Sequence, residues 1–232
     1  MIQTVFKRYE LKYLITKEQK QRILRAAAPY MARDQYGRTL IRNIYFDTDS
    51  FLLVRRSIER PVYKEKLRIR SYGTSETAFV ELKKKYESIV YKRRLSLPAD
   101  AAMDWIAGKT PCPEDTQIAR EIGYFLSYYK GLSPKVLLTY EREAFYAFED
   151  SAFRVTFDDN ILCRETDVSL RAPVGGGPLL GEDRALMEIK CAGGLPLWMV
   201  RVLSEEKIYK TSFSKYGTAY QKYIYPEVLC YV

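Results

Sequence analysis

One short stretch, Lys66-Leu67-Arg68-Ile69-Arg70, alternates strictly between cations and aliphatic side chains. Successive side chains on a β-strand point to opposite faces, so this spacing predicts a strand with three cations on one face and two aliphatic residues on the other. Three cations in a row on one strand face are unusual. Such a face is either a heavily solvated surface or the wall of a site for anions.

The same period of two recurs along most of the chain. Charged or polar residues share one strand face at Arg8/Glu10/Lys12, Glu81/Lys83/Lys85, Lys92/Arg94, Tyr140/Arg142, Arg154/Thr156/Asp158 and Glu188/Lys190. The opposite faces carry aliphatic residues such as Leu11, Leu82 and Ile189. We therefore expect a mainly antiparallel sheet with one face that is ionic on nearly every strand.

Turn and cap residues divide the sequence into alternating elements. Strands are expected over 6–14, 40–47, 62–71, 78–86, 89–97, 135–148, 153–157, 161–169 and 185–191. Helices are expected over 16–29, 49–55, 98–106, 114–129, 196–204 and 212–223. No repeat or linker divides the sequence, so we expect one α+β domain over residues 1–232.

Two arrangements of the sheet explain its ionic face. An open sheet would cover its apolar face with helices and leave the charges in water. A closed eight-stranded antiparallel barrel, or tunnel, would instead enclose an ionic lumen and carry the helices outside, which removes the sheet edges. Like charges that face inward repel and lose hydration, so a closed lumen requires water or a bound polyanion. Period and charge leave both arrangements open.

Composition removes several classes of catalytic site. The sequence has no histidine, which excludes Ser-His-Asp and Cys-His nucleophiles and His-based zinc sites. The four cysteines are widely separated and form no C-x-x-C pair, so we expect free thiols at Cys112, Cys163, Cys191 and Cys230. Neither a signal peptide nor a run of about 18 apolar residues occurs, and we expect a soluble cytoplasmic protein.

The balance of charge favours an anionic partner. Lys and Arg number 38 against 29 Asp and Glu, which gives a net charge of +9. Guanidinium forks match phosphate oxygens in pairs and Lys adds point charge, so a row of both suits a chain of phosphoryl groups. Glu10 and Glu188 would then be oxygen ligands for a divalent cation on those phosphates. The alternative for each carboxylate is a salt bridge to a neighbouring Lys or Arg, and for Glu10 alone the salt bridge is the better explanation.

Taken in order, these segments resemble the triphosphate tunnel metalloenzyme (CYTH-like) superfamily, and most of all the polyphosphate polymerase domain of the vacuolar transporter chaperone (VTC) family. The resemblance extends over nearly the whole chain. It is carried by the motifs at 8–13, Tyr45-Phe46-Asp47, 67–73, 79–83, 140–145, 154–158, Glu188-Ile189-Lys190 and Phe213-Ser214-Lys215-Tyr216.

The resemblance implies roles for individual residues. Arg68, Arg70 and Glu188 would carry catalysis, and Glu188 with Glu10 would bind Mn²⁺ or Mg²⁺. Phosphate-binding residues would be Lys12, Arg68, Arg70, Lys83, Lys92, Arg94, Arg142, Arg154, Lys190 and Lys215. Two positions depart from the family patterns. Arg8 replaces the first Glu of the hydrolase branch, and Ser212 stands where the last helix often has a further Lys.

The resemblance therefore predicts a phosphotransferase that moves the terminal phosphate of ATP, or another nucleoside triphosphate, to a growing polyphosphate chain. Phosphoryl transfer depends on positioning and charge neutralisation, so it does not need histidine. Two alternatives remain: a tripolyphosphatase or nucleoside triphosphatase of the same fold, and a non-catalytic module that binds polyphosphate or nucleic acid. The expected partners are the triphosphate and polyphosphate themselves, with nucleic acid less favoured because many tyrosines have helical spacing that suits a core.

Overall fold

A computed structural model describes residues 9–59, 61–87, 89–150 and 152–226. These residues form an α+β fold with a ten-stranded sheet and six α-helices. The strands are β1 (Tyr9–Thr16), β2 (Met31–Asp47), β3 (Tyr63–Tyr72), β4 (Thr77–Tyr86), β5 (Ile89–Pro98), β6 (Ser133–Ala147), β7 (Arg154–Arg164), β8 (Gly177–Pro178), β9 (Arg184–Cys191) and β10 (Lys210–Thr211). The helices are α1 (Lys17–Ala27), α2 (Leu52–Ile58), α3 (Ala99–Ile106), α4 (Gln117–Tyr128), α5 (Leu197–Glu205) and α6 (Lys215–Ala219), which continues as a π-helical turn (Tyr220–Ile224).

The sheet is open, so the prediction of a closed eight-stranded barrel is wrong. Its strands are hydrogen-bonded in the order β10-β1-β9-β7-β6-β2-β3-β4-β5, and β8 pairs with β7. Within the described residues, β5 and β10 end this order and do not pair with each other. Side-chain alternation could not have decided this point, because closure depends on strand tilt and stagger rather than on which face carries charge.

The chain divides into two compact units, each assembled from three segments. The first unit comprises Met1–Leu40, Tyr140–Ile161 and Leu180–Phe213. The second comprises Ile41–Thr139, Leu162–Leu179 and Ser214–Val232. The long strands β2, β6 and β7 contribute residues to both.

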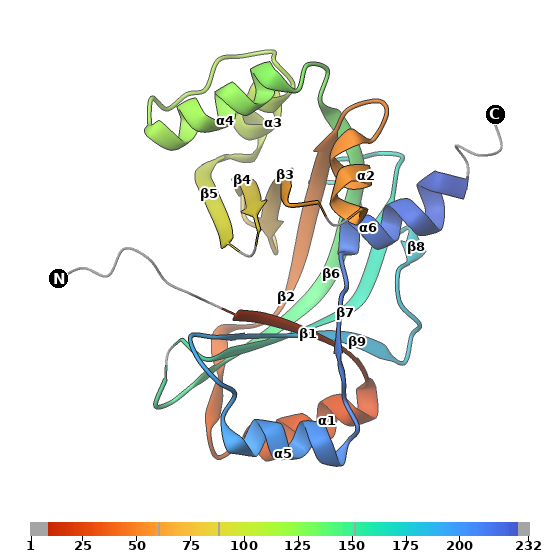
Figure 1. Ribbon diagram of the computed structural model, residues 1–232. Helices are drawn as coiled ribbons and strands as arrows, with labels where there is room; N and C mark the ends of the chain where they lie inside the picture. The colour runs from red at the N-terminus through yellow and green to blue at the C-terminus, as the bar shows by residue number, and fades with distance from the viewer. Residues whose placement is uncertain (1–8, 60, 88, 151, 227–232) are drawn as a thin grey trace. The chain divides into compact units, whose positions relative to one another are not determined.

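In the first unit, β1 pairs antiparallel with β9, and α1 and α5 lie side by side (Figure 1). Thr16 caps α1: its hydroxyl accepts a hydrogen bond from Gln19 N, and the side-chain oxygen of Gln19 accepts one from Thr16 N. This capping box fixes the turn from β1 into α1. The core beneath includes Ile15, Ile189 and Met199, each fully buried.

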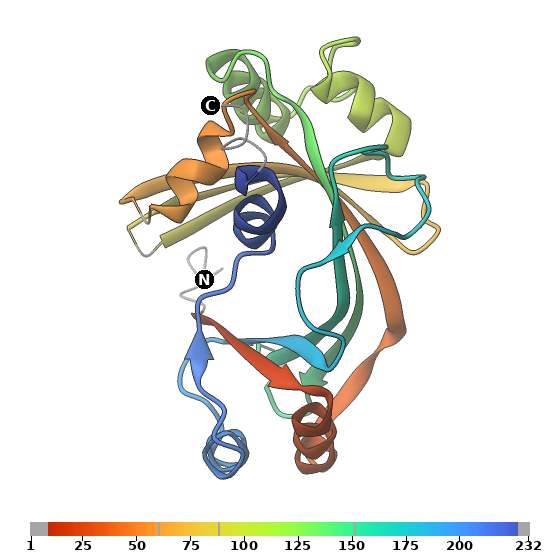
Figure 2. The ribbon, with the colours of Figure 1, turned by 90° about the vertical axis from the view of Figure 1, so that its right-hand side faces the viewer.

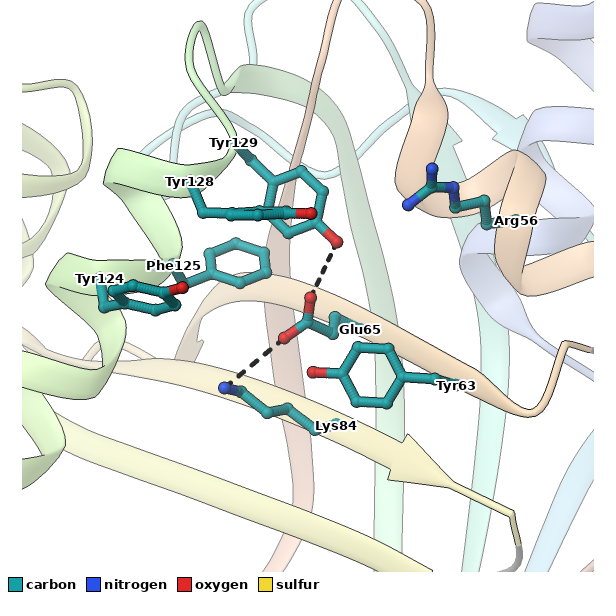
Figure 3. A pocket seen from close by; sticks show the side chains of 8 residues that line it. All are labelled: Arg56, Tyr63, Glu65, Lys84, Tyr124, Phe125, Tyr128 and Tyr129. Carbon is teal, nitrogen blue, oxygen red and sulfur yellow. Dashed lines mark hydrogen bonds and ion pairs between the residues drawn. The ribbon is translucent and has the colours of Figure 1, made fainter.

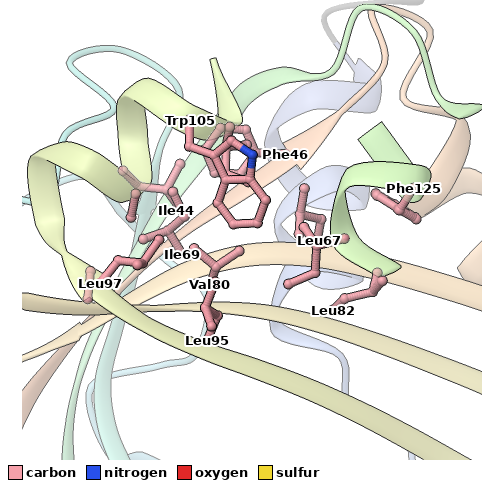
Figure 4. Packing of buried hydrophobic residues seen from close by; sticks show 14 of the residues in the cluster. Ile44, Phe46, Leu67, Ile69, Val80, Leu82, Leu95, Leu97, Trp105 and Phe125 are labelled. Atoms are coloured by element: carbon pink, nitrogen blue, oxygen red, sulfur yellow. The ribbon is translucent and has the colours of Figure 1, made fainter. Parts of the chain in front are cut away.

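In the second unit, β3, β4 and β5 form the predicted meander, with α3 and α4 over its apolar face (Figure 4). Leu67, Ile69 and Leu82 from the strands are fully buried against Trp105 of α3 and Phe125 of α4. Each aliphatic side chain removed from water contributes about 1.5–3 kcal/mol. Packing on this face holds the strand alternation in register, so the cations must project from the other face.

A buried carboxylate joins the end of β2 to two helices of the second unit. Asp47 accepts hydrogen bonds from Leu53 N at 2.9 Å and Val54 N at 3.0 Å, which caps the start of α2. Its Oδ2 also accepts from the Tyr216 hydroxyl of α6 at 3.0 Å. The helices α2 and α6 consequently lie side by side, as Figures 1 and 2 both show.

Several predicted elements have different bounds. β2 begins at Met31 rather than residue 40, and the predicted strands 153–157 and 161–169 are one strand, β7. β7 continues through Asn160 because this residue adopts a φ of 49°, a conformation that Asn tolerates better than most residues. The last helix begins at Lys215 instead of Ser212, and its cap is Ser214. The predicted strand residues 6–8, with Arg8, lie outside the described residues.

The thiols of Cys163 and Cys191 are buried and that of Cys112 is half-buried, and all three are free; Cys230 lies outside the described residues. Burial raises the pKa of the Cys163 thiol to about 12. Among the helices of the described chain, none combines the length and the apolar character that a membrane crossing requires.

Candidate functional site

Two rows of charged side chains cross β3, β4 and β5 of the second unit. The strand register places Arg68 beside Glu81, and Glu81 beside Arg94. The second row on the same face consists of Lys66, Lys83 and Lys92. Three consecutive strands therefore bring together most of the predicted phosphate-binding residues of this unit.

Glu81 is the centre of these rows and is only 1% exposed. Its Oε2 accepts from Arg68 Nε at 2.7 Å, and its Oε1 accepts from Arg94 Nε at 2.7 Å. Lys92 Nζ lies 2.6 Å from Oε1, and Arg70 Nε lies 4.0 Å from Oε2. Burial alone would raise the pKa of Glu81, but the surrounding cations outweigh it and hold the pKa far below its usual range. Four cations thus lie around one buried carboxylate.

Arg70 also contacts two neutral side chains. Its Nε donates to Asn43 Oδ1 at 2.7 Å, and its Nη1 donates to the Tyr72 hydroxyl at 3.4 Å. The same hydroxyl accepts from Arg94 Nη2 at 3.2 Å. These contacts fix the orientation of the Arg70 guanidinium beside Arg94 and Glu81.

Two groups of this cluster have pKa values near neutrality. The Tyr45 hydroxyl accepts a hydrogen bond from Arg68 Nη1 at 3.0 Å. Burial would raise the pKa of Tyr45, but Arg68 and the other cations of β3 lower it to about 8. The pKa of Lys92 is also lowered to about 8, mainly because burial disfavours its charged form. The net charge of the cluster therefore changes with pH around 8.

The beginning of α6 is tied to the second row of cations. Ser214 Oγ accepts from Gly217 N at 3.2 Å and from Lys66 Nζ at 2.9 Å. Lys215, half-buried, is the next residue. The start of α6 therefore lies beside Lys66, and the phosphate-binding role of Lys215 stays a prediction.

In the first unit, Lys12 of β1 lies opposite Glu188 of β9. Lys12 Nζ is 3.3 Å from Glu188 Oε1 and 3.5 Å from Glu10 Oε1, and it donates to the carbonyl of Phe213 at 3.0 Å. Glu188 is 7% exposed, whereas Glu10 is exposed. The two predicted metal ligands share one ammonium group.

Arg142 belongs to the same group of charges. Its Nε and Nη2 bind the two oxygens of Asp158 at 2.5 and 2.6 Å, and Nη2 is 3.3 Å from Glu188 Oε2. Asp158 is fully buried. Burial would lower the pKa of Arg142, but the charge of Asp158 outweighs it and raises the pKa well above its usual value. A guanidinium paired in this way mainly orients Glu188, so its predicted contact with phosphate is an open prediction.

The next row of the first unit runs from Arg154 through Lys190 to Glu10. Arg154 is exposed and Lys190 is half-buried. Thr156 lies opposite Glu188, and its buried hydroxyl has no hydrogen-bond partner among the described residues. These two neighbouring rows therefore place Arg154 and Lys190 close to the carboxyl groups of Glu10 and Glu188, with the buried Thr156 hydroxyl on the same face.

These donors fit a divalent cation that completes its coordination with phosphate oxygens. Mg²⁺ in proteins is usually held by one or two carboxylates together with substrate phosphates and water, and carboxylates also suit Mn²⁺. Glu188 and Glu10 are diagonal neighbours on paired strands, and the Thr156 hydroxyl faces the same region. The described part of the chain holds no group of three or more acidic or thiol side chains that would bind a metal alone.

The sequence pattern placed these residues on the correct faces but missed the partners that organise them. Glu81 and Asp158 were grouped with the cations of their own strands and received no role. Tyr45 and Tyr72, whose hydroxyls contact Arg68, Arg70 and Arg94, were also missed. The role of Glu81 could have been predicted from the sequence, because a single acidic residue on a basic strand face is expected to pair with the cations on the neighbouring strands.

The fold and these clusters define an α+β protein with a sheet face suited to polyanions. The chain belongs to the VTC domain family, whose model matches residues 7–224. The family resemblance carried by the sequence motifs is thereby confirmed. No curated protein matches the chain by sequence.

Solved structures of the same fold come from distant proteins. A candidate adenylate cyclase from Bacillus halodurans is 17% identical, with a TM-score of 0.55, and the match covers 88% of this chain and 92% of that one. A candidate adenylyl cyclase from Hippeastrum with a dominant triphosphatase activity is 16% identical, with a TM-score of 0.53 and coverage of 91% and 94%. At this level of identity the likeness shows the fold alone.

Proposed function

We propose that this protein transfers the terminal phosphoryl group of a nucleoside triphosphate, such as ATP, to the end of an inorganic polyphosphate chain. The observation that supports it most is the cluster around Glu81, in which one buried carboxylate is surrounded by four cations. Such an excess of fixed positive charge is costly unless a polyanion occupies it. Membership of the VTC domain family points to the same class of ligand.

The transfer needs no protein nucleophile. An anionic oxygen at the end of the polyphosphate chain attacks the γ-phosphorus, a new P–O–P bond forms, and the bond to the β-phosphate breaks to release the nucleoside diphosphate. Because the attacking oxygen is already ionised, a general base is unnecessary. The protein supplies position and charge, in keeping with the absence of histidine.

In this mechanism Arg68 and Arg70 bind the triphosphate. Lys83, Lys92 and Arg94 add positive charge beside them. A fixed guanidinium fork binds two phosphate oxygens at once and stabilises the charge that spreads over them during transfer. Glu188 and Glu10 would hold Mn²⁺ or Mg²⁺, and the metal would neutralise phosphate charge. Lys12 and Arg142 set the orientation of Glu188, while Arg154, Lys190 and Lys215 bind further phosphates.

A triphosphatase is the second candidate, because the Hippeastrum protein of the same fold has a dominant triphosphatase activity. In that reaction water replaces the polyphosphate oxygen. The same charged residues would serve both reactions, so the choice between them depends on the acceptor that reaches the γ-phosphorus.

The test is incubation of the purified chain with ATP and Mn²⁺ or Mg²⁺, followed by separate measurement of phosphate polymer and free phosphate. A growing polymer supports the proposal, and free phosphate without polymer supports the hydrolase. If neither product forms with any divalent metal, and if Glu188→Gln leaves triphosphate affinity unchanged in the presence and absence of metal, the chain is a binding module.

A further inference from the structure

The other face of the β3–β4 hairpin carries a pocket that the proposed reaction does not use. Glu65 and Lys84 alternate with the cations of β3 and β4, so they lie on the face covered by α4. The pocket has a volume of about 260 Å³. As Figure 3 shows, its lining residues come from α2, β3, β4 and the α4 region: Arg56, Tyr63, Glu65, Lys84, Tyr124, Phe125, Tyr128 and Tyr129.

Glu65 is the only acidic residue of this lining and is 7% exposed. Its Oε2 accepts a hydrogen bond from the Tyr129 hydroxyl at 2.8 Å. Burial, followed by a hydrogen bond to Glu65, raises the pKa of Tyr63 above its usual value. The phenols of Tyr63 and Tyr129 thus both contact the side chain of Glu65.

The cation beside Glu65 is loosely bound. Lys84 Nζ lies 3.6 Å from Glu65 Oε1, beyond hydrogen-bond distance, and the Lys84 side chain is 28% exposed. By contrast, the buried Glu81 on the opposite face has direct contacts at 2.6 and 2.7 Å. A buried carboxylate gains most from a cation in direct contact, so Glu65 retains capacity for a closer partner.

The walls favour a positively charged guest. Four tyrosines and one phenylalanine surround Glu65, and Tyr63, Tyr124 and Tyr128 are exposed in spite of their size. Aromatic rings attract ammonium groups through their π-faces, especially where water is excluded. Rings that lie exposed beside a pocket are also typical of a binding site rather than of core packing.

We propose that this pocket binds a small organic ammonium ion, with the ammonium group against Glu65 and the alkyl part between the tyrosine rings. The guest displaces the Lys84 ammonium into solvent and becomes the direct partner of Glu65. Arg56 also lines the pocket (Figure 3) and repels a guest that carries a second positive charge beside it. A monocation is therefore preferred to a polycation.

The experiment is a titration of the full chain with n-butylammonium, followed by calorimetry and by the NMR signals of the tyrosine rings. The neutral 1-pentanol, which has a similar length, is the control ligand. Sodium chloride keeps the ionic strength constant. Since the chain carries a net charge of +9, general attraction of cations does not explain saturable binding. We expect binding roughly ten-fold tighter than that of 1-pentanol, the scale of a desolvated cation–π contact.

Two variants have opposite expected effects. Glu65→Gln removes the charge and should abolish the preference for butylammonium over 1-pentanol. Lys84→Gln removes the ammonium group that competes with the ligand for Glu65, so it should tighten butylammonium binding. Butylammonium should also raise the melting temperature of this variant more than that of the natural chain. Tyr128→Ala, at an exposed ring, should weaken binding without loss of fold, whereas Tyr209→Ala, at another exposed ring outside the pocket, should not.

The proposal is overturned if 1-pentanol binds as tightly as butylammonium, if Glu65→Gln keeps the preference, or if Lys84→Gln weakens binding. Equal effects of Tyr128→Ala and Tyr209→Ala would also overturn it. A purine nucleotide that shifts the same ring signals while butylammonium does not would assign the pocket to a different ligand. All these outcomes are independent of the polyphosphate assay.

Discussion

The clusters around Glu81 and Glu188 contain the same residue types in different proportions. Around Glu81, four cations share one buried carboxylate. Around Glu188, Lys12 and Arg142 contact three carboxylates, those of Glu10, Asp158 and Glu188, and the cations Arg154 and Lys190 lie in the next row. The first cluster is rich in cations around one carboxylate, as an anion site requires, whereas the second is rich in the carboxylate oxygens that ligate a divalent cation.

The largest expected effect comes from removing a guanidinium group from the Glu81 cluster. Arg68→Ala should lower the rate of phosphoryl transfer by about 10³-fold or more, the scale of an arginine that stabilises a transferred phosphoryl group. The rate of Arg68→Lys should lie between the rates of Arg68→Ala and the natural chain, because lysine keeps the positive charge but loses the two-pronged guanidinium. Turnover of labelled ATP measures the effect, and Arg171→Ala, at a highly exposed arginine, is the control. Equal rates in Arg68→Ala and the control would remove Arg68 from the site.

Removing the negative charge of Glu81 or of Asp158 should destabilise the fold in both cases, but a bound polyanion should compensate only for the loss at Glu81. Glu81→Gln leaves four cations without their common partner and should destabilise the fold by about 3–5 kcal/mol, and Asp158→Asn should have an effect of similar size on Arg142. Inorganic tripolyphosphate should restore the melting temperature of Glu81→Gln, because it replaces the missing negative charge. It should restore Asp158→Asn much less, since Glu188 still neutralises Arg142. Equal rescue of both would contradict the difference between the clusters.

Glu188→Gln should have a smaller effect, mainly on the metal requirement. We expect a loss of about 10²-fold in activity at limiting Mn²⁺, typical of a weakened metal site, with partial recovery at high metal concentration. Affinity for tripolyphosphate without metal should remain or increase, because a negative charge is lost. Activity measured across a metal titration provides the readout, and Glu121→Gln, at a partly exposed carboxylate bound to Arg93, is the matched control. An unchanged metal dependence would exclude Glu188 as a ligand.

The contrast also explains what the sequence could predict. The rows Arg68–Glu81–Arg94 and Lys66–Lys83–Lys92 follow from three short strands joined by tight turns, because alternation and turn length together determine the register. The pairing of β1 with β9 joins residues far apart in the chain, and no local pattern specifies it. The contact between Lys12 and Glu188 was therefore not predicted, although the family resemblance assigned both residues to the site.

The errors have physical causes of the same kind. The segment 31–40 is part of β2, although its polar residues lack the apolar alternation that marks a strand. The residues around Asn160 resemble a turn, yet β7 continues because Asn adopts a positive φ there. The open sheet was missed because an ionic face suits both an open sheet and a closed one. Interactions between distant segments decide such points.

The smallest expected effect is a pH dependence confined to the Glu81 cluster. As pH rises through about 8, Tyr45 becomes negative and Lys92 neutral, so the cluster loses positive charge and tripolyphosphate affinity should fall by several-fold. Both pKa values are lower in the folded chain than in the unfolded one. The unfolded chain therefore binds more protons above pH 8, and the stability of the ligand-free protein should rise with pH over the same range.

Opposite pH trends for affinity and stability are thus expected from the same two groups. Tyr45→Phe and Lys92→Arg should each reduce the fall in affinity between pH 7 and 9, and the double variant should nearly remove it. The ionisation of tripolyphosphate itself is common to all variants and cancels when they are compared. Tyr86→Phe, at an exposed tyrosine, should behave like the natural chain. If the natural chain and the double variant have the same pH profile, these two groups do not control the charge that the ligand meets.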